Sequence, residues 1–265
     1  MSEEAGLQRF VLGRYLDRHE CRAVTGGPAE WRLTHRTYVL DGNVNREGSA
    51  MRADPPAGFE HFVPAGAKGA ADPGRALLAF HAASARGNPM TPTRNRPAAL
   101  DAALDAALAR AEIRDLCMAY ARGVDRADAE LLASIFTEDS TVISGVVNGS
   151  GKQFAEQITA FVRDNLEMCF HSVANEWVDV RGDEAVGEHY AIAQMVQAGT
   201  EVLTGGRYID HYVRRDGRWL IRSRTFVADW THSHPSTMQR DGFYEALTIR
   251  GCFGREDPVY AHWAQ

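Results

Sequence analysis

The segment Glu112–Phe136, with the sequence EIRDLCMAYARGVDRADAELLASIF, contains the end of one helix and the start of the next. Its apolar side chains recur at helical spacing as far as Val124, and the chain turns after Asp125. Asp125 continues the apolar stripe that faces the core. A buried carboxylate is costly unless a partner holds it. The sequence therefore predicts a partner for Asp125 from another part of the fold.

The rest of the sequence after position 97 has helices first and strands last. We expect helices at 98–124, 128–136 and 151–165, the second capped by Asp128. We expect strands at 141–147, 170–180, 185–197, 201–214 and 218–228. Helices followed by a long antiparallel sheet predict an α+β domain.

Residues 1–96 differ from the remainder, being rich in Gly, Pro, Ala and Arg with weak periodicity. Such composition favours loops or disorder. We therefore expect an irregular N-terminal extension of unknown role, with one strand at 31–40 and one short helix at 77–85. The domain itself is expected to span 97–265. Its tail after Asp229 is predicted to be irregular and to pack over an opening or onto a neighbouring subunit.

Composition and charge exclude several classes of protein. The net charge of −6 argues against a nucleic-acid partner, which needs a basic face. No apolar run approaches the ~20 residues that span a bilayer, and the N-terminus lacks an apolar signal core. We therefore expect a cytoplasmic protein without a membrane partner. The cysteines show no CxxC spacing, so we expect neither a zinc site nor disulfides, and no other cofactor.

His171 is the candidate partner of Asp125. A carboxylate that accepts a proton on one imidazole nitrogen leaves the other nitrogen free to act as a base. General-base help of this kind contributes about 10²–10⁴ in rate. Two ordinary alternatives stay open at this point. Asp125 could be a turn carboxylate that caps the next helix, and His171 could be a core histidine bonded to the backbone.

Arg224 is a charged residue in an otherwise apolar row of the last expected strand, with Leu220 and Phe226 on the same face and Trp219 and Ile221 opposite. A buried guanidinium needs an anion or a carboxylate. Arg224 could bind a leaving hydroxide, a halide or an enolate oxygen. It could equally form an ion pair with Asp125, Asp210 or Glu188.

Further candidates for a substrate pocket lie on the expected strands. Regular alternation puts side chains two positions apart on the same face as His171. The candidate lining residues are Cys169, Asn175, Trp177, Tyr190, Tyr208 and His211. Tyr208 and Tyr212 alternate with Ile209 and His211, so only one of these pairs faces inward. For each aromatic residue alone, ordinary sheet packing is the alternative. The Gly205-Gly206 pair is interpreted as a bulge or bend.

This order of elements resembles the SnoaL-like branch of the nuclear transport factor 2-like superfamily. The resemblance covers roughly residues 109–230. It rests on AEIRDL, GVDR, LASIF, His171 followed by Asn175, GGRYIDHYVRRDGRW and Arg224. It implies a cone-shaped, curved antiparallel sheet wrapped against three helices around a deep apolar pocket.

Within that branch the sequence resembles hexachlorocyclohexane dehydrochlorinases and, more distantly, scytalone dehydratases. The resemblance places Asp125 and His171 at the positions of an Asp–His dyad, and Arg224 at that of a pocket arginine near the leaving group. Tyr120 stands where the dehydrochlorinase has a lysine. A tyrosine hydroxyl could instead bind an oxygen of the substrate, as tyrosines do in the dehydratase.

We therefore expect a cofactor-independent lyase that eliminates water or HX from a small apolar cyclic or aromatic compound. His171 would be the base, Asp125 would orient it, and Arg224 with Tyr120 would stabilise the oxygen or leaving group. Isomerisation or retro-aldol carbon–carbon cleavage on the same dyad is an alternative. A non-catalytic ligand-binding or assembly subunit is another. The expected partners are a small-molecule substrate and further copies of the chain, as a homotrimer or homodimer.

Overall fold

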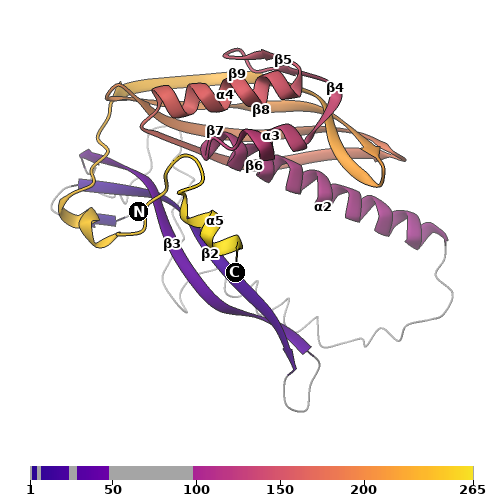
Figure 1. Ribbon diagram of the computed structural model, residues 1–265, viewed down its shortest axis with the longest axis horizontal. Helices are drawn as coiled ribbons and strands as arrows, with labels where there is room; N and C mark the ends of the chain where they lie inside the picture. The colour runs from indigo at the N-terminus through magenta and orange to yellow at the C-terminus, as the bar shows by residue number, and fades with distance from the viewer. Residues whose placement is uncertain (1, 5–6, 24–28, 48–97, 265) are drawn as a thin grey trace, which may run out of the picture.

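A computed structural model of the chain describes residues 2–4, 7–23, 29–47 and 98–264. Its larger part is a curved sheet with the order β5-β4-β9-β8-β7-β6, and helices cover one face of it (Figure 1). The helices are α2 (Ala98–Asp125), α3 (Ala129–Ser134) and α4 (Gly151–Asn165). The strands are β4 (Phe136–Ile143), β5 (Asn148–Gly149), β6 (Met168–Arg181), β7 (Glu184–Gln197), β8 (Thr200–Arg215) and β9 (Arg218–Pro235).

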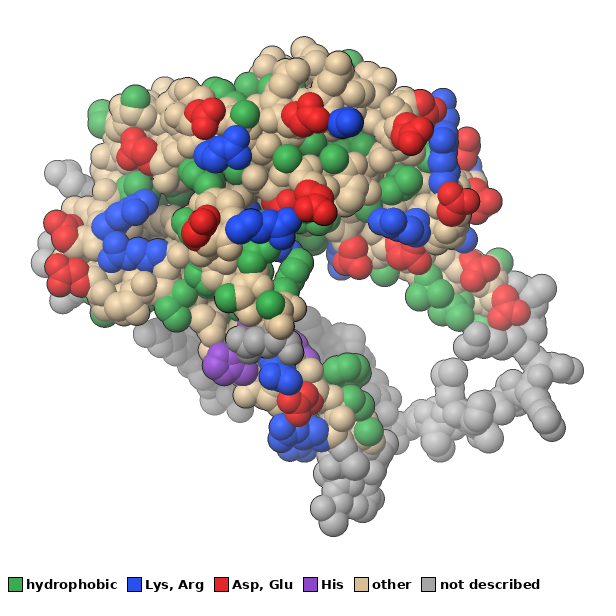
Figure 2. Space-filling model, viewed as in Figure 1, with side chains coloured by type: hydrophobic (Ala, Val, Ile, Leu, Met, Phe, Trp, Pro, Cys, Tyr) green, Lys and Arg blue, Asp and Glu red, His purple; other side chains and the backbone are tan. Residues whose placement is uncertain are grey.

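This arrangement confirms the expected α+β cone fold, with one difference in the sheet. β4 pairs with β9 in parallel, whereas all the other neighbouring strands are antiparallel. The sheet is therefore mixed. None of the described helices is long and apolar enough to cross a membrane. Acidic and basic side chains are interspersed on the face of the molecule seen in Figure 2.

The N-terminal part contradicts the expectation of an irregular extension where the structure describes it. Strands β1 (Ser2–Glu4), β2 (Leu7–Ala23) and β3 (Ala29–Glu47) form an antiparallel sheet, and β3 contains the strand expected at 31–40. The β2–β3 ribbon exposes much of its length, so its sequence lacks a clean apolar-in, polar-out alternation. The helix expected at 77–85 lies outside the described residues.

The C-terminal tail is more ordered than expected and packs against this ribbon. β9 continues to Pro235, and the tail then forms η2 (Gly242–Ala246) and α5 (Pro258–Trp263). Val259 of α5 forms a small core with Leu16 and Val39 of the ribbon. Two-stranded ribbons are marginally stable alone, so the tail supplies the apolar contacts that the β2–β3 ribbon needs.

Helix α4 begins with a complete capping box. The Gln153 backbone N–H donates to the Ser150 hydroxyl at 3.3 Å, and the Gln153 side chain accepts from the Ser150 backbone N–H at 3.0 Å. We expect Ser150→Ala to lower the free energy of unfolding by about 1 kcal/mol, because an N–H of the first turn loses its acceptor. Urea denaturation measures this loss. Ser150→Gly is the matched control, with an expected loss of roughly a few tenths of a kcal/mol. Equal losses for Ser150→Ala and Ser150→Gly would contradict the capping role.

Candidate active site

Asp125 and His171 are in direct contact, and we refer to them below as the Asp125–His171 pair. His171 Nδ1 lies 2.6 Å from Asp125 Oδ1, and the His171 backbone N–H donates to Asp125 Oδ2 at 2.9 Å. Asp125 is buried, with 7% of its surface exposed. Both carboxylate oxygens are thus held by one residue, which fixes the plane of the carboxylate relative to the imidazole ring.

The end of α2 positions Asp125. Ala127 adopts a left-handed conformation with φ of 52°, and its N–H donates to the Val124 carbonyl at 3.1 Å. The Asp128 N–H donates to the Gly123 carbonyl at 2.8 Å. These two bonds form a Schellman motif, which closes a helix end. A side chain at Gly123 would meet Leu132 of α3 at 3.0 Å, so glycine permits the close approach of the next helix.

The charge state of Asp125 follows from its surroundings. Burial raises the pKa of this carboxyl, but the charge of a protonated His171 and the hydrogen bonds from His171 outweigh it, so the pKa is lowered overall. Asp125 is therefore ionised at neutral pH and accepts the proton on Nδ1. The second ring nitrogen, Nε2, is then unprotonated in the neutral ring. Among the described residues, none hydrogen-bonds to Nε2.

The lowered pKa predicts how stability depends on pH. A carboxyl with a lowered pKa in the folded state contributes stability above its unfolded pKa, about 3.9, and that stability is lost as pH falls through the folded value. We expect Asp125→Asn to lower the free energy of unfolding more at pH 7 than at pH 3. Urea denaturation at both pH values checks this. Asp115→Asn, an exposed change in the same helix, is the control; an equal loss at both pH values for Asp125→Asn would contradict the prediction.

His171 lines an apolar cavity of about 170 Å³ between α2, α4 and the sheet. Three other expected residues, Tyr120, Cys169 and Tyr208, also line it. Much of the remaining wall is apolar and comes from Val124, Phe154, Ile158, Phe161, Val162 and Phe226. Two polar residues, Ser144 and Thr204, also line the cavity and were not expected. Neither belongs to a chemical motif, so no sequence signal distinguished them from ordinary surface hydroxyls.

The two cavity tyrosines are neutral hydrogen-bond donors. Burial raises the pKa of Tyr120 to about 12 and that of Tyr208 well above its ordinary value. Their ring centres lie 5.2 Å apart in an edge-to-face arrangement. Both hydroxyls therefore keep their protons at neutral pH.

Cys169 is a protonated thiol. Burial, followed by the charge of Asp125, raises its pKa well above the ordinary value, which disfavours the thiolate that a nucleophile or metal ligand needs. Cys169, Asp125 and His171 lie close enough together to surround a metal ion. Both carboxylate oxygens of Asp125 already accept hydrogen bonds from His171, however, and these bonds compete with the binding of a metal ion.

Arg224 lies behind the cavity wall rather than in it. Its guanidinium donates to both oxygens of Asp210, with Nε 2.8 Å from Oδ1 and Nη2 2.7 Å from Oδ2. The guanidinium lies over the rings of Tyr120 and Tyr208, at 4.2 and 4.4 Å from their centres. The structure thus supports the ion-pair alternative, with Asp210 as partner. The expected contact of Arg224 with a leaving group is not supported, because the tyrosines line the cavity and Arg224 does not.

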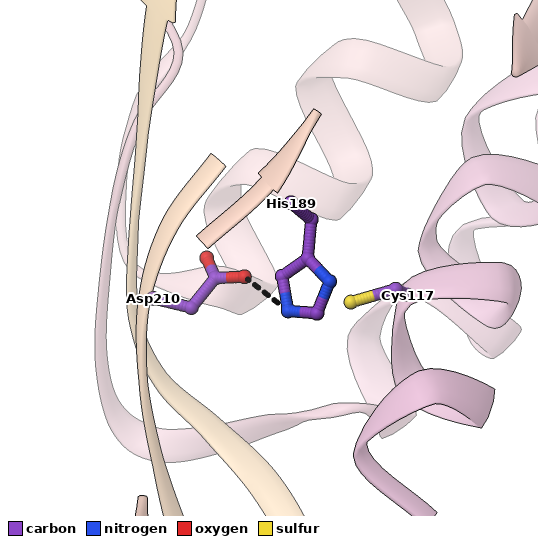
Figure 3. Close-up of side chains that lie close together, drawn as sticks. All are labelled: Cys117, His189 and Asp210. Atoms are coloured by element: carbon purple, nitrogen blue, oxygen red, sulfur yellow. Dashed lines mark ion pairs between the residues drawn. The ribbon is translucent and has the colours of Figure 1, made fainter. Parts of the chain in front are cut away.

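A second buried cluster shares Asp210 with this ion pair. Its side chains Cys117, His189 and Asp210 are drawn in Figure 3. The side chains of Cys117, His189 and Asp210 converge closely enough to hold a metal ion. The hydroxyl of Tyr212 lies among them, 2.6 Å from Asp210 Oδ2, 2.9 Å from His189 Nε2 and 3.4 Å from Cys117 Sγ. Burial lowers the pKa of His189, which favours the neutral ring. The cluster is therefore a hydrogen-bond centre around Tyr212, and its phenol takes the position that an ion would need.

Three expected lining residues lie outside the cavity, two of them because β6 contains an extra residue. Ala174 pairs with Tyr190 and Glu176 pairs with His189, so Asn175 has no partner on β7 and adopts φ of 35°. This bulge reverses the alternation after it. Trp177 is 76% exposed as a result, and Asn175 is also exposed. Tyr190 points to the outer face of the sheet and is 43% exposed. These three predictions were wrong.

The alternation of buried and exposed side chains in β8 and β9 tests the predictions about which residues of these strands face inward. Tyr208 and Tyr212 are buried while Ile209 is exposed, so the prediction that His211 lines the pocket was also wrong. A register shift at Arg222 places Trp219 and Ile221 on the buried face with Arg224, where regular alternation had separated them. The expected irregularity at Gly205-Gly206 is confirmed by a register shift there.

Comparisons with known proteins bear on the same region. Residues 105–225 match the family model described as a SnoaL-like domain, as expected from the sequence. Similar solved structures include a type 2 hexachlorocyclohexane dehydrochlorinase, with 24% identity over 49% of this chain and 92% of that one, at a TM-score of 0.47. A type 3 hexachlorocyclohexane dehydrochlorinase from Novosphingobium barchaimii LL02 has 22% identity over 49% of this chain and 93% of that one, at a TM-score of 0.46. A candidate scytalone dehydratase from Novosphingobium aromaticivorans DSM 12444 has 20% identity over 49% of this chain and 91% of that one, at a TM-score of 0.44. No curated protein matches the sequence.

Proposed function

We propose that residues 105–225, which are a SnoaL-like domain, carry out proton abstraction and elimination on a small, largely apolar molecule, without a cofactor. His171 is the base and Asp125 orients it. The observation that carries this proposal is the 2.6 Å contact of Asp125 with His171 on the wall of an apolar cavity. An ionised carboxylate bound to Nδ1 leaves Nε2 as the base and stabilises the imidazolium that forms.

In the proposed step, His171 Nε2 removes a proton from a carbon of the substrate. The electron pair of that C–H bond forms a carbon–carbon double bond, and the bond from the neighbouring carbon to the leaving group breaks. When the leaving group is hydroxide, the imidazolium returns the proton and water is released. Tyr120 and Tyr208 keep their protons, so their hydroxyls can donate hydrogen bonds to the departing oxygen.

The size and lining of the cavity support a cyclic or aromatic substrate. A dry cavity of about 150 Å³ in another protein holds benzene, and the cavity here measures about 170 Å³. Two neutral hydroxyl donors favour a leaving group or substituent that contains oxygen. Elimination of water is therefore the preferred outcome over elimination of a halide. Isomerisation and retro-aldol cleavage remain alternatives that use the same base.

A mass-spectrometric screen tests the proposal. Wild-type protein and His171→Ala are incubated with panels of hydroxylated ring compounds, halogenated ring compounds and aldol-type compounds, and the products are identified by mass. Loss of 18 mass units in the wild type alone supports dehydration. Ligand binding by both proteins, with no product from either, supports the non-catalytic binding alternative. Turnover by His171→Ala at the wild-type rate would refute the proposed base.

We also propose that the chain self-associates as a homodimer or homotrimer through the outer face of the sheet. That face exposes large apolar side chains, with Trp177 76%, Tyr190 43%, Ile192 46% and Ile209 42% exposed. Contiguous exposed apolar patches mark interaction surfaces. We expect Ile209→Asp to lower the molar mass measured by light scattering towards that of a single chain. Ile143→Asp, a similarly exposed isoleucine on β4, is the matched control; an unchanged mass for Ile209→Asp would contradict this interface.

A further inference from the structure

A network of two arginines and two aspartates, buried except for part of Arg14, lies next to the Asp125–His171 pair. Arg126 Nη1 donates to Asp41 Oδ1 at 3.0 Å and lies 3.5 Å from Asp257 Oδ2. Arg14 contacts the same two carboxylates, at 2.9 Å from Asp41 and 2.6 Å from Asp257. The side chains of Asp41 and Asp257 are fully buried, and that of Arg126 is nearly so. The four charges balance, so no ion in the network is left uncompensated.

The network joins three parts of the chain that are far apart in sequence. Arg14 lies in β2 and Asp41 in β3, whereas Asp257 caps α5 of the C-terminal tail. The ribbon and the tail lie side by side below the larger sheet (Figure 1). Both lie outside the SnoaL-like domain at 105–225, yet they converge on Arg126, the residue that follows Asp125.

Arg126 also connects the two elements that supply the pair. Its Nη2 donates to the carbonyl of Cys169 at 3.0 Å, and Cys169 lies two residues before His171 in β6. The carbonyl of Arg126 accepts from the N–H of Gly254 in the tail at 2.8 Å. One residue thus links the end of α2, the start of β6 and the tail. The distance between Asp125 and His171 depends on the separation of those same two elements.

We propose that Arg126 is a positioning residue for the Asp125–His171 pair, and that the β2–β3 ribbon and the C-terminal tail hold it through Asp41 and Asp257. The site then depends on segments outside the SnoaL-like domain. This inference rests on the proposed function for its catalytic consequence, but its structural part stands without it. A displacement of about 1 Å in a reacting group can lower the rate about 10²-fold, so a small shift of Arg126 has a measurable effect.

The test uses the full chain with Asp41→Asn and Arg126→Lys. Asp41→Asn keeps the shape but removes the charge that holds Arg126, and Arg126→Lys keeps the charge but cannot bind two partners in one plane. Asp17→Asn is the matched control, because it breaks a 2.7 Å ion pair with Arg36 in the same ribbon without contacting Arg126. One readout is the nuclear magnetic resonance signal of the His171 ring, which needs no substrate. The other is kcat and KM for whichever substrate the screen identifies.

We expect both test variants to move the His171 ring signal and to lower kcat about tenfold or more, with a much smaller change in KM. Asp17→Asn should leave both readouts at wild-type values. Unchanged ring signals in folded Asp41→Asn and Arg126→Lys would overturn the inference. Equal changes in Asp17→Asn would also overturn it, as would unfolding of the test variants, because the network would then serve stability alone. If the ring signal shifts in the test variants but the wild type turns over no substrate, the result counts against the proposed function and not against this inference.

Discussion

Replacing His171 with alanine is expected to lower kcat by about 10²–10⁴, because the reaction loses its proposed general base. KM should change much less, since the apolar walls of the proposed substrate cavity remain in place. Initial rates over a range of substrate concentrations measure both constants. His232→Ala removes an exposed histidine from the end of β9 and serves as the control, with wild-type values expected.

Asp125→Asn sharpens the same test. The amide keeps the shape of the carboxylate but cannot hold the His171 ring in the same protonation state, so kcat should again fall by about 10²–10⁴. The double variant should be little worse than His171→Ala alone, because residues that act as a unit have strongly non-additive effects. Additive losses would show that the two residues act separately and would contradict the pair.

Replacing Asp210 with alanine is expected to lower the free energy of unfolding by about 3–5 kcal/mol. The change leaves Arg224, which is 1% exposed, as a buried charge without its carboxylate. It also removes the acceptor of the Tyr212 hydroxyl. Urea denaturation at pH 7 measures the loss. Asp229→Ala breaks an exposed ion pair with Arg207 in the same sheet and should cost no more than about 1 kcal/mol.

A double substitution separates the two sources of that loss. Asp210→Leu with Arg224→Met removes both charges and fills much of the space with apolar atoms. Replacing a buried ion pair in this way is often neutral or stabilising, so the double variant should be more stable than Asp210→Ala. A double variant that is less stable would show that packing around the guanidinium, including its contacts with Tyr120 and Tyr208, matters more than the charges.

The helices were predictable because their signals are local. Asp128 occupies the capping position expected for it, and the apolar stripe of 98–124 marks the helix that carries Asp125. The identity of the pair also followed from the residues together with the family resemblance. The contact distance did not, since it depends on how the end of α2 meets β6.

The faces of the strands were not predictable where one residue was inserted. A single bulge at Asn175 turns Trp177 outwards, and a register shift at Arg222 brings Ile221 inwards. Neither leaves a clear mark in the sequence. The partner of Arg224 was one of three carboxylates, and only tertiary structure selects Asp210. Apart from the strand expected at 31–40, the β2–β3 ribbon was missed, because it packs against a tail about 200 residues away.

The cavity has two unlike walls, and this bears on how its specificity can diverge. Tyr120 and Tyr208 are backed by Arg224 and its ion pair, so any change there disturbs buried charge. The part of the wall on α4 consists of Phe154, Ile158, Phe161 and Val162, which are apolar and carry no charge. Exchanges among apolar residues of similar volume usually cost less than about 1.5 kcal/mol. For the proposed function, we therefore expect substitutions in α4 to change the substrate range at a smaller loss of stability than substitutions of Tyr120 or Tyr208.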